Sequence, residues 1–523
     1  MKKNTYSIFT IALAMLLSSW LSAQSRYTAE IFSEVQVQKD VVYGNNVSIL
    51  TGAPTPTPLL ADVYTPVGDT ETDRPVVLVA HTGSFLPPLL NQTPTGDRGD
   101  STLVEVCTRL AKSGYVAIAF TYRLGWVPTS PNADVRKGSL LQAAYRGIQD
   151  ARTAIRFVKK SVAEDGNPFG CNPEKIAVWG IGTGGYLSAG AATLDDYEEV
   201  ILEKFLDANN LPLADTALLG NFYATTEAPL CIPNHVGYSS DFQLSINMGG
   251  AMGDLSWVDG DGTEPPMVGV HCPSDIFAPY YIGNVSVPTT GELVIEEAAG
   301  TRAVIGEANA NGSNDVFLSL TQDEDPLQAR VNLQKQASFS TPGGDIPLGV
   351  DNMYAFMRPG FEGSPWDWWD ENVIRTKVAF LNTQGFSLDA DLILQGALAT
   401  NPDMSAQKAR TYIDTVFQLV TPRMCLALDL GCELGNSVRE VPASVSGLTV
   451  GPNPASDFTT IRTDVGYPIQ SVMVYDMNGR LVRGITDILD HNYELLTADL
   501  PAGLYSLRVQ FEEGVSLTRL AVQ

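Results

Sequence analysis

The feature that most constrains this chain is an apolar strand that runs through a glycine-rich turn into a helix of small residues. The stretch covers residues 175–192 and reads KIAVWGIGTGGYLSAGAA. The run from Ile176 to Trp179 is typical of a strand that is covered on both faces. The turn holds glycines at 180, 182, 184 and 185, and glycine adopts unusual backbone conformations without steric cost. We therefore expect a tight strand–turn–helix unit here.

Strands and helices alternate on both sides of this unit. Apolar runs lie at 75–80, 116–122, 244–248 and 267–270, and residues 139–160 carry a helical apolar stripe. This alternation predicts a mostly parallel sheet with helices on both faces. Two alternating stretches, 34–43 and 59–64, predict half-buried strands that pair antiparallel. The polar stretches 195–241 and 283–350 interrupt the rhythm, and we interpret them as insertions or lids over the carboxyl ends of the strands.

The first residues predict an exported protein. Lys2 and Lys3 precede an apolar core at 8–21, and a small-residue cleavage site ends at Ala23, so residues 1–23 have the pattern of a secretory signal peptide. No later stretch is long and apolar enough to span a bilayer, so we expect no transmembrane span in the mature form. The formal net charge of −26 argues against nucleic acid and anionic membranes as partners.

Cysteine spacing and acidic residues give no sign of a metal site. Cys425 and Cys432 lie close together among six cysteines, and in an exported chain they are the pair that we expect to form a disulfide. The other four cysteines show no Cys-x-x-Cys spacing, which argues against zinc. The stretch 259–264, DGDGTE, lacks the full calcium-loop pattern and favours a solvated turn. We expect neither metal nor cofactor.

The composition changes from about Glu433. A linker rich in Ser, Val and Pro, which we assign to 435–446, leads into short alternating strands. Asn478-Gly479 follows one of these strands and is a strong hairpin signal. Residues 447–523 are therefore predicted to form a separate small β-sandwich.

This tail resembles the C-terminal sorting domain of the type IX secretion system. Three ordered motifs carry the resemblance: PNP at 452–454, YDMNGRLV at 475–482 and LPAGLY at 500–505. The resemblance implies that the type IX machinery is a partner. It also implies export across the outer membrane, usually with removal of the tail, followed by release or attachment at the cell surface.

Residues 30–430 resemble secreted α/β-hydrolases of the carboxylesterase and feruloyl-esterase-like group. The motifs are LADVY at 60–64, HTG at 81–83, YRLG at 122–125, QDAR at 149–152, NPEKI at 172–176 and HCPSD at 271–275. The resemblance implies an α/β-hydrolase fold, which we assign to residues 24–434. It also implies that Asp275 stands at the position of the catalytic acid, and that Gly83, Ser84 and Thr183 are oxyanion or ligand-binding residues.

The nucleophile of that family is missing. Acyl transfer in this fold requires serine, acid and histidine in that order, with the serine at the centre of a G-x-S-x-G turn. Here the frame is Gly180-x-Gly182-x-Gly184, so the nucleophile position is Gly182, which has no side chain. Thr183 is the nearest hydroxyl, but the family uses its backbone N–H, and its side chain is expected to point away.

The catalytic base is missing as well. The four histidines are His81, His235, His271 and His491, and none lies between His271 and the tail, where the family's base would follow Asp275. His81 is the possible substitute base. Loss of the nucleophile or base alone costs roughly 10⁶ in kcat in a hydrolase. We therefore expect a pseudohydrolase that binds a small-molecule, glycan or phenolic-ester ligand.

Other interpretations remain open at this point. A working esterase with a rearranged site would use His81 or His235 with Thr183 or Ser84, and a structural cell-surface protein would bind no ligand. The glycine turn also matches the dinucleotide pattern G-x-G-x-x-G, but it does not lie in the first strand–helix unit. The stretch 366–369, WDWW, forms either a platform for sugar or phenolic rings or buried packing.

Overall fold

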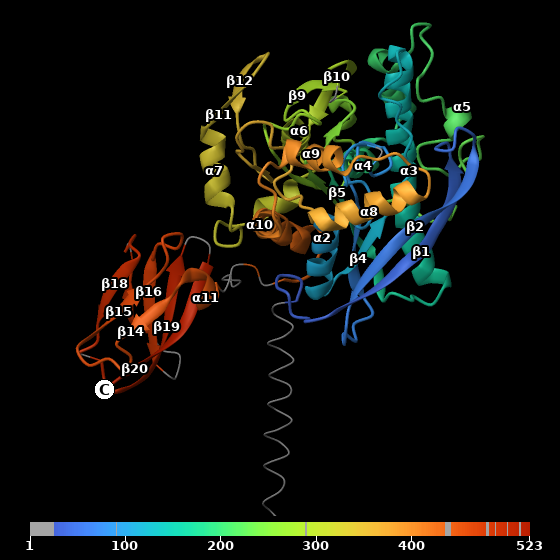
Figure 1. The fold of residues 1–523 in the computed structure, drawn as a ribbon. Helices are drawn as coiled ribbons and strands as arrows, with labels where there is room; N and C mark the ends of the chain where they lie inside the picture. Colours follow the sequence, from blue (N-terminus) through green and yellow to red (C-terminus); the bar gives the residue numbers. More distant parts are fainter. Residues whose placement is uncertain are drawn as a thin grey trace, which may run out of the picture. The chain divides into compact units, whose positions relative to one another are not determined.

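The computed structural model describes residues 26–89, 91–287, 290–432, 434, 441–476, 481–486, 488–498, 500–511 and 514–523. The predicted signal peptide, residues 435–440 of the predicted linker and the Asn478-Gly479 turn lie outside the described residues. The chain divides into two compact units, Met1–Leu434 and Gly435–Gln523, and Figure 1 shows their different architectures.

An eight-stranded sheet forms the centre of the larger unit. Its order is β1-β2-β4-β3-β5-β6-β8-β13. The bounds are β1 (Val35–Ser48), β2 (Thr55–Pro66), β3 (Arg74–Ala80), β4 (Val116–Phe120), β5 (Cys171–Ile181), β6 (Leu244–Met248), β8 (Met267–His271) and β13 (Met353–Ala355). β2 pairs antiparallel with β1 and with β4, and all other neighbours are parallel. The mostly parallel sheet and the antiparallel pair are confirmed.

Helices cover both faces of this sheet (Figure 1). Leu78 of β3 belongs to the core cluster that includes residues of α3 (Ala133–Glu164), α4 (Thr183–Thr193) and α6 (Thr301–Ala310). Its neighbour Val79 belongs to the second cluster, which includes α2 (Ser101–Lys112) and α10 (Ala406–Ala427). Successive strand residues point to opposite faces. Because both faces are covered, every residue of β3 is buried, which explains the continuous apolar run at 75–80.

The interrupting stretches only partly match the prediction of lids. The stretch 283–350 contains α6, which packs its buried residues into the central core, so this part is not a lid. Much of the remainder forms short elements, and β10 pairs with β7 and β9 in a separate three-stranded sheet. The elements of these stretches are η1 (Tyr197–Val200), η2 (Glu203–Phe205), α5 (Thr216–Leu219), β9 (Ile282–Ser286), β10 (Leu293–Gly300), η4 (Asp315–Ser319), α7 (Gln328–Gln336), β11 (Ser338–Thr341) and β12 (Gly344–Pro347). β7 (Ala251–Met252) and η3 (Leu255–Trp257) lie between the two stretches.

A pair of helices that the sequence analysis did not identify follows β13. They are α8 (Glu371–Thr383) and α9 (Ala390–Thr400). Their buried residues Ile374, Val378 and Ile393 form a small cluster with Leu89, separate from the two main clusters of the sheet. Because Leu89 lies in the loop that follows β3, this cluster fastens the helix pair to the loop.

The smaller unit is built mainly of antiparallel strands in two sheets, β14-β15-β18 and β17-β16-β19-β20. Its elements are α11 (Ala443–Ser446), β14 (Thr449–Gly451), β15 (Phe458–Arg462), β16 (Ser471–Asp476), β17 (Leu481–Ile485), β18 (Asn492–Leu496), β19 (Gly503–Phe511) and β20 (Gly514–Val522). Ile461 and Leu495 of one sheet share a core with Val474 and Leu507 of the other. The predicted small C-terminal β-sandwich is confirmed.

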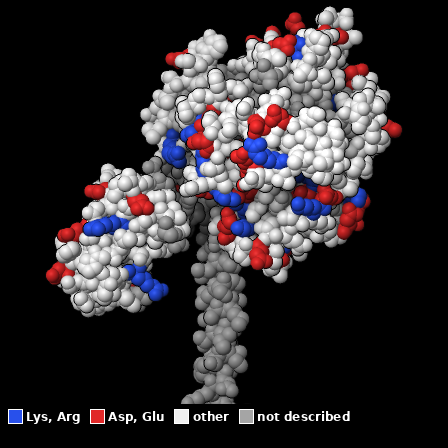
Figure 2. Space-filling view, viewed as in Figure 1, with Lys and Arg blue, Asp and Glu red and all other residues white. Residues whose placement is uncertain are grey.

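Cys425 and Cys432 form a disulfide, which is the expected pair. The remaining cysteines are buried and free. Within the described residues, no helix has the length and hydropathy needed to cross a membrane. On the face shown in Figure 2, Lys and Arg side chains lie among Asp and Glu rather than in one basic patch.

A buried ion pair joins the end of β4 to α3. The Arg123 guanidinium lies 2.9 Å from an Asp150 carboxylate oxygen, and the two side chains are 2% and 0% exposed. The Arg123 backbone N–H also donates to Asp150, at 2.8 Å. Removing one partner of such a pair leaves an uncompensated charge in the core.

We predict that Asp150→Ala lowers the free energy of unfolding by about 3–5 kcal/mol. The matched control is Asp351→Ala, because Asp351 and its partner Lys335 are 52% and 36% exposed and such pairs contribute less than about 1 kcal/mol. All seven tryptophans precede residue 370, so urea unfolding followed by tryptophan fluorescence reports on the larger unit. Equal losses in the two variants would contradict the prediction.

Candidate functional site

The turn between β5 and α4 keeps the strained geometry of a nucleophile elbow. Gly182 has φ 53° and ψ −117° and precedes Thr183, the first residue of α4. L side chains rarely adopt such a conformation, and an elbow uses it to present a serine above the sheet. Gly182 N–H donates to Met248 O at 2.9 Å, and Gly182 O accepts from Gly185 N–H at 2.8 Å. These bonds hold the turn against the end of β6.

Close backbone contacts explain the glycines on either side of this position. A Cβ atom on Gly180 would lie 1.9 Å from Gly184 O, and a Cβ on Gly184 would lie 2.3 Å from Ala80 O. Any side chain at these two positions would therefore push α4 away from the sheet. The glycine frame is required by packing, whether or not the position between them carries a nucleophile.

The space above Gly182 is occupied by Thr82. A Cβ atom on Gly182 would lie 2.1 Å from Thr82 Oγ1 and 2.7 Å from Thr82 Cβ, closer than side chains approach one another. Thr82 lies in the loop after β3, which the sequence analysis matched to the oxyanion loop. In H-G-G-G-type loops the second residue is glycine, whereas this chain reads His81-Thr82-Gly83-Ser84. The threonine at this position is the one sign in the sequence that the space above position 182 is filled, and we did not predict it.

The predicted oxyanion residues Gly83, Ser84 and Thr183 all line one cavity. Tyr122 OH donates to His81 O at 2.8 Å and lies 3.1 Å from Thr183 Oγ1. Because the phenol has only one hydrogen, the Thr183 hydroxyl donates its proton to Tyr122. The Thr183 side chain is therefore engaged with Tyr122, and no imidazole accepts its proton.

The two histidines considered as substitute bases have structural contacts. The His81 ring is 2% exposed, stacks on Tyr122 at 4.3 Å, and its Nδ1 donates to Thr82 O at 2.6 Å. Burial lowers the pKa of His81 to about 4. The His235 Nε2 lies 2.7 Å from Tyr43 O. Neither ring is among the described residues that line the cavity.

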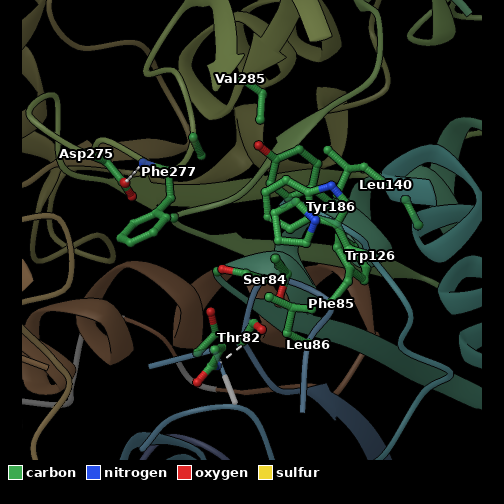
Figure 3. Close-up of a pocket in the computed structure, with 18 of the residues that line it drawn as sticks. Thr82, Ser84, Phe85, Leu86, Trp126, Leu140, Tyr186, Asp275, Phe277 and Val285 are labelled. Atoms are coloured by element: carbon green, nitrogen blue, oxygen red, sulfur yellow. Dashed lines mark hydrogen bonds between the residues drawn. The ribbon is translucent and has the colours of Figure 1, made fainter. Parts of the chain in front are cut away.

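Asp275 follows β8 and its carboxylate lines the cavity (Figure 3). Oδ1 accepts from Phe277 N–H at 2.7 Å, and Oδ2 lies 3.6 Å from Nε2 of the fully buried His271. The residues after β13, 356–370, include no histidine. In this loop Gly363 lies against the carboxylate, because a Cβ there would be 2.9 Å from Asp275 Cγ.

The cavity has a volume of about 440 Å³, within the range of small-molecule sites. Its walls are mainly apolar and aromatic, as Figure 3 shows for Phe85, Trp126, Leu140 and Val285. Among the described lining residues, none is Lys, Arg or His, and Asp275 and Asp367 are the carboxylates. Burial raises the pKa of Asp367 to about 6.

The tryptophan stretch 366–369 contributes to this cavity. Trp366 is 2% exposed, packs edge-on against Phe356, and lines the cavity together with Trp369. The Arg410 guanidinium lies over the Trp368 ring at 5.5 Å. Packing therefore holds Trp366, and two of the three indoles also form part of the cavity wall.

The acidic turn at 259–264 uses its carboxylates in local hydrogen bonds. Asp259 accepts from Asp261 N–H, Asp261 accepts from Thr263 N–H, and Glu264 accepts from Asp259 N–H. Throughout the part of the chain that the structure describes, no group of three His, Cys, Asp or Glu residues has an arrangement that could hold a metal ion.

We predict that Gly182→Ser lowers the free energy of unfolding by roughly 1–3 kcal/mol, through overpacking against Thr82 and backbone strain. In a Thr82→Gly background the same substitution should cost less, because only the strain remains. The double-mutant cycle in urea measures the coupling between the two positions. Gly343→Ser is the control, since the nearest atom to a Cβ there lies 3.8 Å away. Equal costs in both backgrounds would show that Thr82 does not fill this space.

The depressed pKa of His81 predicts a stability loss in acid. Its folded-state pKa is about 4, below the ordinary value near 6.5, so the unfolded chain takes up the proton first as the pH falls. The contribution of neutral His81 to the free energy of unfolding is fully present above pH ~6.5. It decreases by up to about 3 kcal/mol as the pH falls towards ~4. The difference in unfolding free energy between the protein and His81→Gln should shrink over this range. A difference that is independent of pH would contradict the prediction.

Two parts of the chain match known families. Residues 61–227 match the family model described as BD-FAE, and residues 449–523 match the secretion system C-terminal sorting domain. Among curated proteins, no sequence matches the chain significantly.

Similar solved structures are esterases. A thermophilic esterase of Thermogutta terrifontis, bound to propionate, is 20% identical over 49% of this chain and 77% of its own, with a TM-score of 0.28. Esterase B from Lactobacillus rhamnosis is 15% identical over 58% of this chain and 81% of its own, with a TM-score of 0.29. At these values the likeness bears on neither activity nor substrate.

The sorting-domain match means that the chain is exported by type IX secretion and is either secreted or attached at the cell surface. Residues 61–227 are thus similar to an esterase-like α/β-hydrolase family, and residues 449–523 carry a secretion sorting domain at the C-terminal end.

Proposed function

We propose that this protein is a non-catalytic pseudohydrolase that reaches the exterior through an N-terminal signal peptide and type IX secretion, and that binds a small apolar ligand. The observation that carries the proposal is the position of Thr82. Its Oγ1 lies 2.1 Å from where the Cβ of a nucleophile at position 182 would stand. The nucleophile is absent, and the space that it would need is filled.

The surroundings of Asp275 support the same conclusion. In a working triad the acid orients a histidine that takes the proton of the nucleophile. Here Gly363 lies against the carboxylate, and the only imidazole near it in the described structure, that of His271, is 0% exposed. A buried ring behind the acid cannot reach an ester in the cavity. Because nucleophile and base are both missing, no side chain is available to attack the ester carbonyl as the serine of a triad does.

The persistence of the cavity supports ligand binding over a purely structural role. A protein that serves only as a surface scaffold has no need of a 440 Å³ apolar cavity, and filling it with side chains would stabilise the core. Small molecules, including the phenolic or glycan esters that related proteins would suggest, are the candidate ligands. The aromatic wall favours the apolar part of such a molecule.

The alternative of a rearranged esterase would require His81 to activate Ser84 or Thr183. The His81 ring is buried and is not among the described residues that line the cavity, and the Thr183 hydroxyl donates to Tyr122. These contacts speak against that pairing. A fluorophosphonate probe, which labels activated serines and threonines, distinguishes the two proposals.

We expect no covalent labelling by the fluorophosphonate, together with reversible binding of the neutral fluorescent probe N-phenyl-1-naphthylamine. Ala144→Trp should abolish probe binding, because Ala144 lines the cavity on α3. Ala163→Trp is the matched control, since Ala163 is exposed on the same helix. Labelling of the protein would refute the non-catalytic proposal, and probe binding that survives Ala144→Trp would refute the assigned cavity.

A further inference from the structure

The loss of the base leaves the catalytic acid facing the cavity without its partner, and this determines the kind of ligand that fits. We propose that the cavity takes an apolar ligand whose polar group donates a hydrogen bond to Asp275, an alcohol or an amine, in preference to a carboxylate. This inference rests on the proposed ligand-binding function and specifies the ligand's polar group.

The Asp275 carboxylate has one oxygen available to a ligand. Oδ1 accepts from Phe277 N–H at 2.7 Å. Oδ2 lies 3.6 Å from His271 Nε2, beyond hydrogen-bond distance, and no other described residue donates to it. Asp275 lines the cavity and its side chain is 6% exposed, so a ligand in the cavity can donate a charge-assisted hydrogen bond to Oδ2.

His271 makes its hydrogen bond to Thr301 rather than to Asp275. Thr301 Oγ1 donates to Gly250 O at 2.8 Å and lies 2.9 Å from His271 Nδ1. The single hydroxyl hydrogen is used on the carbonyl, so His271 Nδ1 carries the proton and donates to Thr301. His271 Nε2 is buried and has no hydrogen-bond partner among the described residues, and at 3.6 Å it makes no hydrogen bond to Asp275 Oδ2.

Tyr186 provides a second, independent sign of a missing ligand. Its hydroxyl is buried and has no hydrogen-bond partner among the described residues, and its side chain lines the same cavity. Burial raises the pKa of Tyr186, and the charge of the Asp275 carboxylate raises it further. The cavity therefore offers a ligand an acceptor at Asp275 and an unpartnered hydroxyl at Tyr186.

The charge of the lining disfavours an anionic ligand. The described lining residues include two carboxylates and no Lys, Arg or His. An anion in an apolar cavity requires a counter-charge, and the only attraction on offer is the N-terminal end of α4, beside Thr82 and Gly182. The aromatic wall, by contrast, accepts cationic groups through their contact with ring faces. A donor or a cation therefore fits this site better than a carboxylate.

A matched octyl series tests the inference: 1-octanol, octylammonium and octanoate, which share one chain and differ in the polar group. Binding is measured by displacement of N-phenyl-1-naphthylamine at pH 8, well above the ordinary pKa of histidine. Because hydrogen bonds to charged groups contribute about 1.5–3 kcal/mol, octanol or octylammonium should bind at least about tenfold more tightly than octanoate. The comparison of octanol with octylammonium decides between alcohol and amine.

Asp275→Asn is the decisive variant, because its side-chain oxygen can still accept from Phe277 N–H while Oδ2 becomes a donor. It should weaken octanol and octylammonium and strengthen octanoate, so that the preference disappears. Asp323→Asn makes the same change at an exposed position and should alter nothing. If octanoate binds as well as the others, or if Asp275→Asn leaves the preference intact, the inference fails although the cavity binds ligands. If no octyl compound and no probe binds, the proposed function itself fails.

Discussion

The site depends on how closely the turn between β5 and α4 packs against its neighbours. Gly180 and Gly184 allow backbone to touch backbone, with no room for a Cβ atom at either position. That packing fixes the turn of Gly182 in a conformation that suits a nucleophile. The remaining space above Gly182 is set by one side chain of the facing loop, Thr82. Relative to an enzyme of this fold, the loop after β3 has the larger residue, Thr82 in place of glycine, and the turn has the smaller one, Gly182 in place of serine. The glycines at 180 and 184 are kept.

The consequences of this exchange extend across the cavity. Without a nucleophile there is no proton to transfer, and a histidine facing Asp275 would have no role. Gly363 lies against the carboxylate, and the acid becomes an acceptor at the wall of an apolar cavity. The sorting domain forms its own core and, by its family match, directs the protein out of the cell. From these two parts we propose an exported binding protein built on a hydrolase scaffold.

Much of this fold was predictable from sequence because its signals are local. A strand buried on both faces, such as β3, leaves a continuous apolar run, and a helix buried on one face, such as α3, leaves an apolar stripe. The motifs of the sorting domain are likewise short segments that can be recognised in the sequence alone. The contact of Thr82 with position 182 could not be predicted from local periodicity, because the two residues are a hundred positions apart. Its one sign in the sequence is the threonine in place of the loop glycine. The contact of His271 with Asp275 and the assignment of α6 to the core also depend on three-dimensional packing. Periodicity within 283–350 was too weak to separate α6 from the adjoining short strands.

The most direct test of the central claim is the steady-state hydrolysis of short-chain 4-nitrophenyl esters and feruloyl esters by the purified protein and by Asp275→Asn. We expect neither protein to raise the rate beyond the small residual acceleration that binding and backbone N–H groups can supply, about 10³–10⁴ over water, and we expect the two rates to be the same. Turnover at the level of a working esterase that is abolished by Asp275→Asn would show that the acid still belongs to a functioning catalytic site, and would contradict the account.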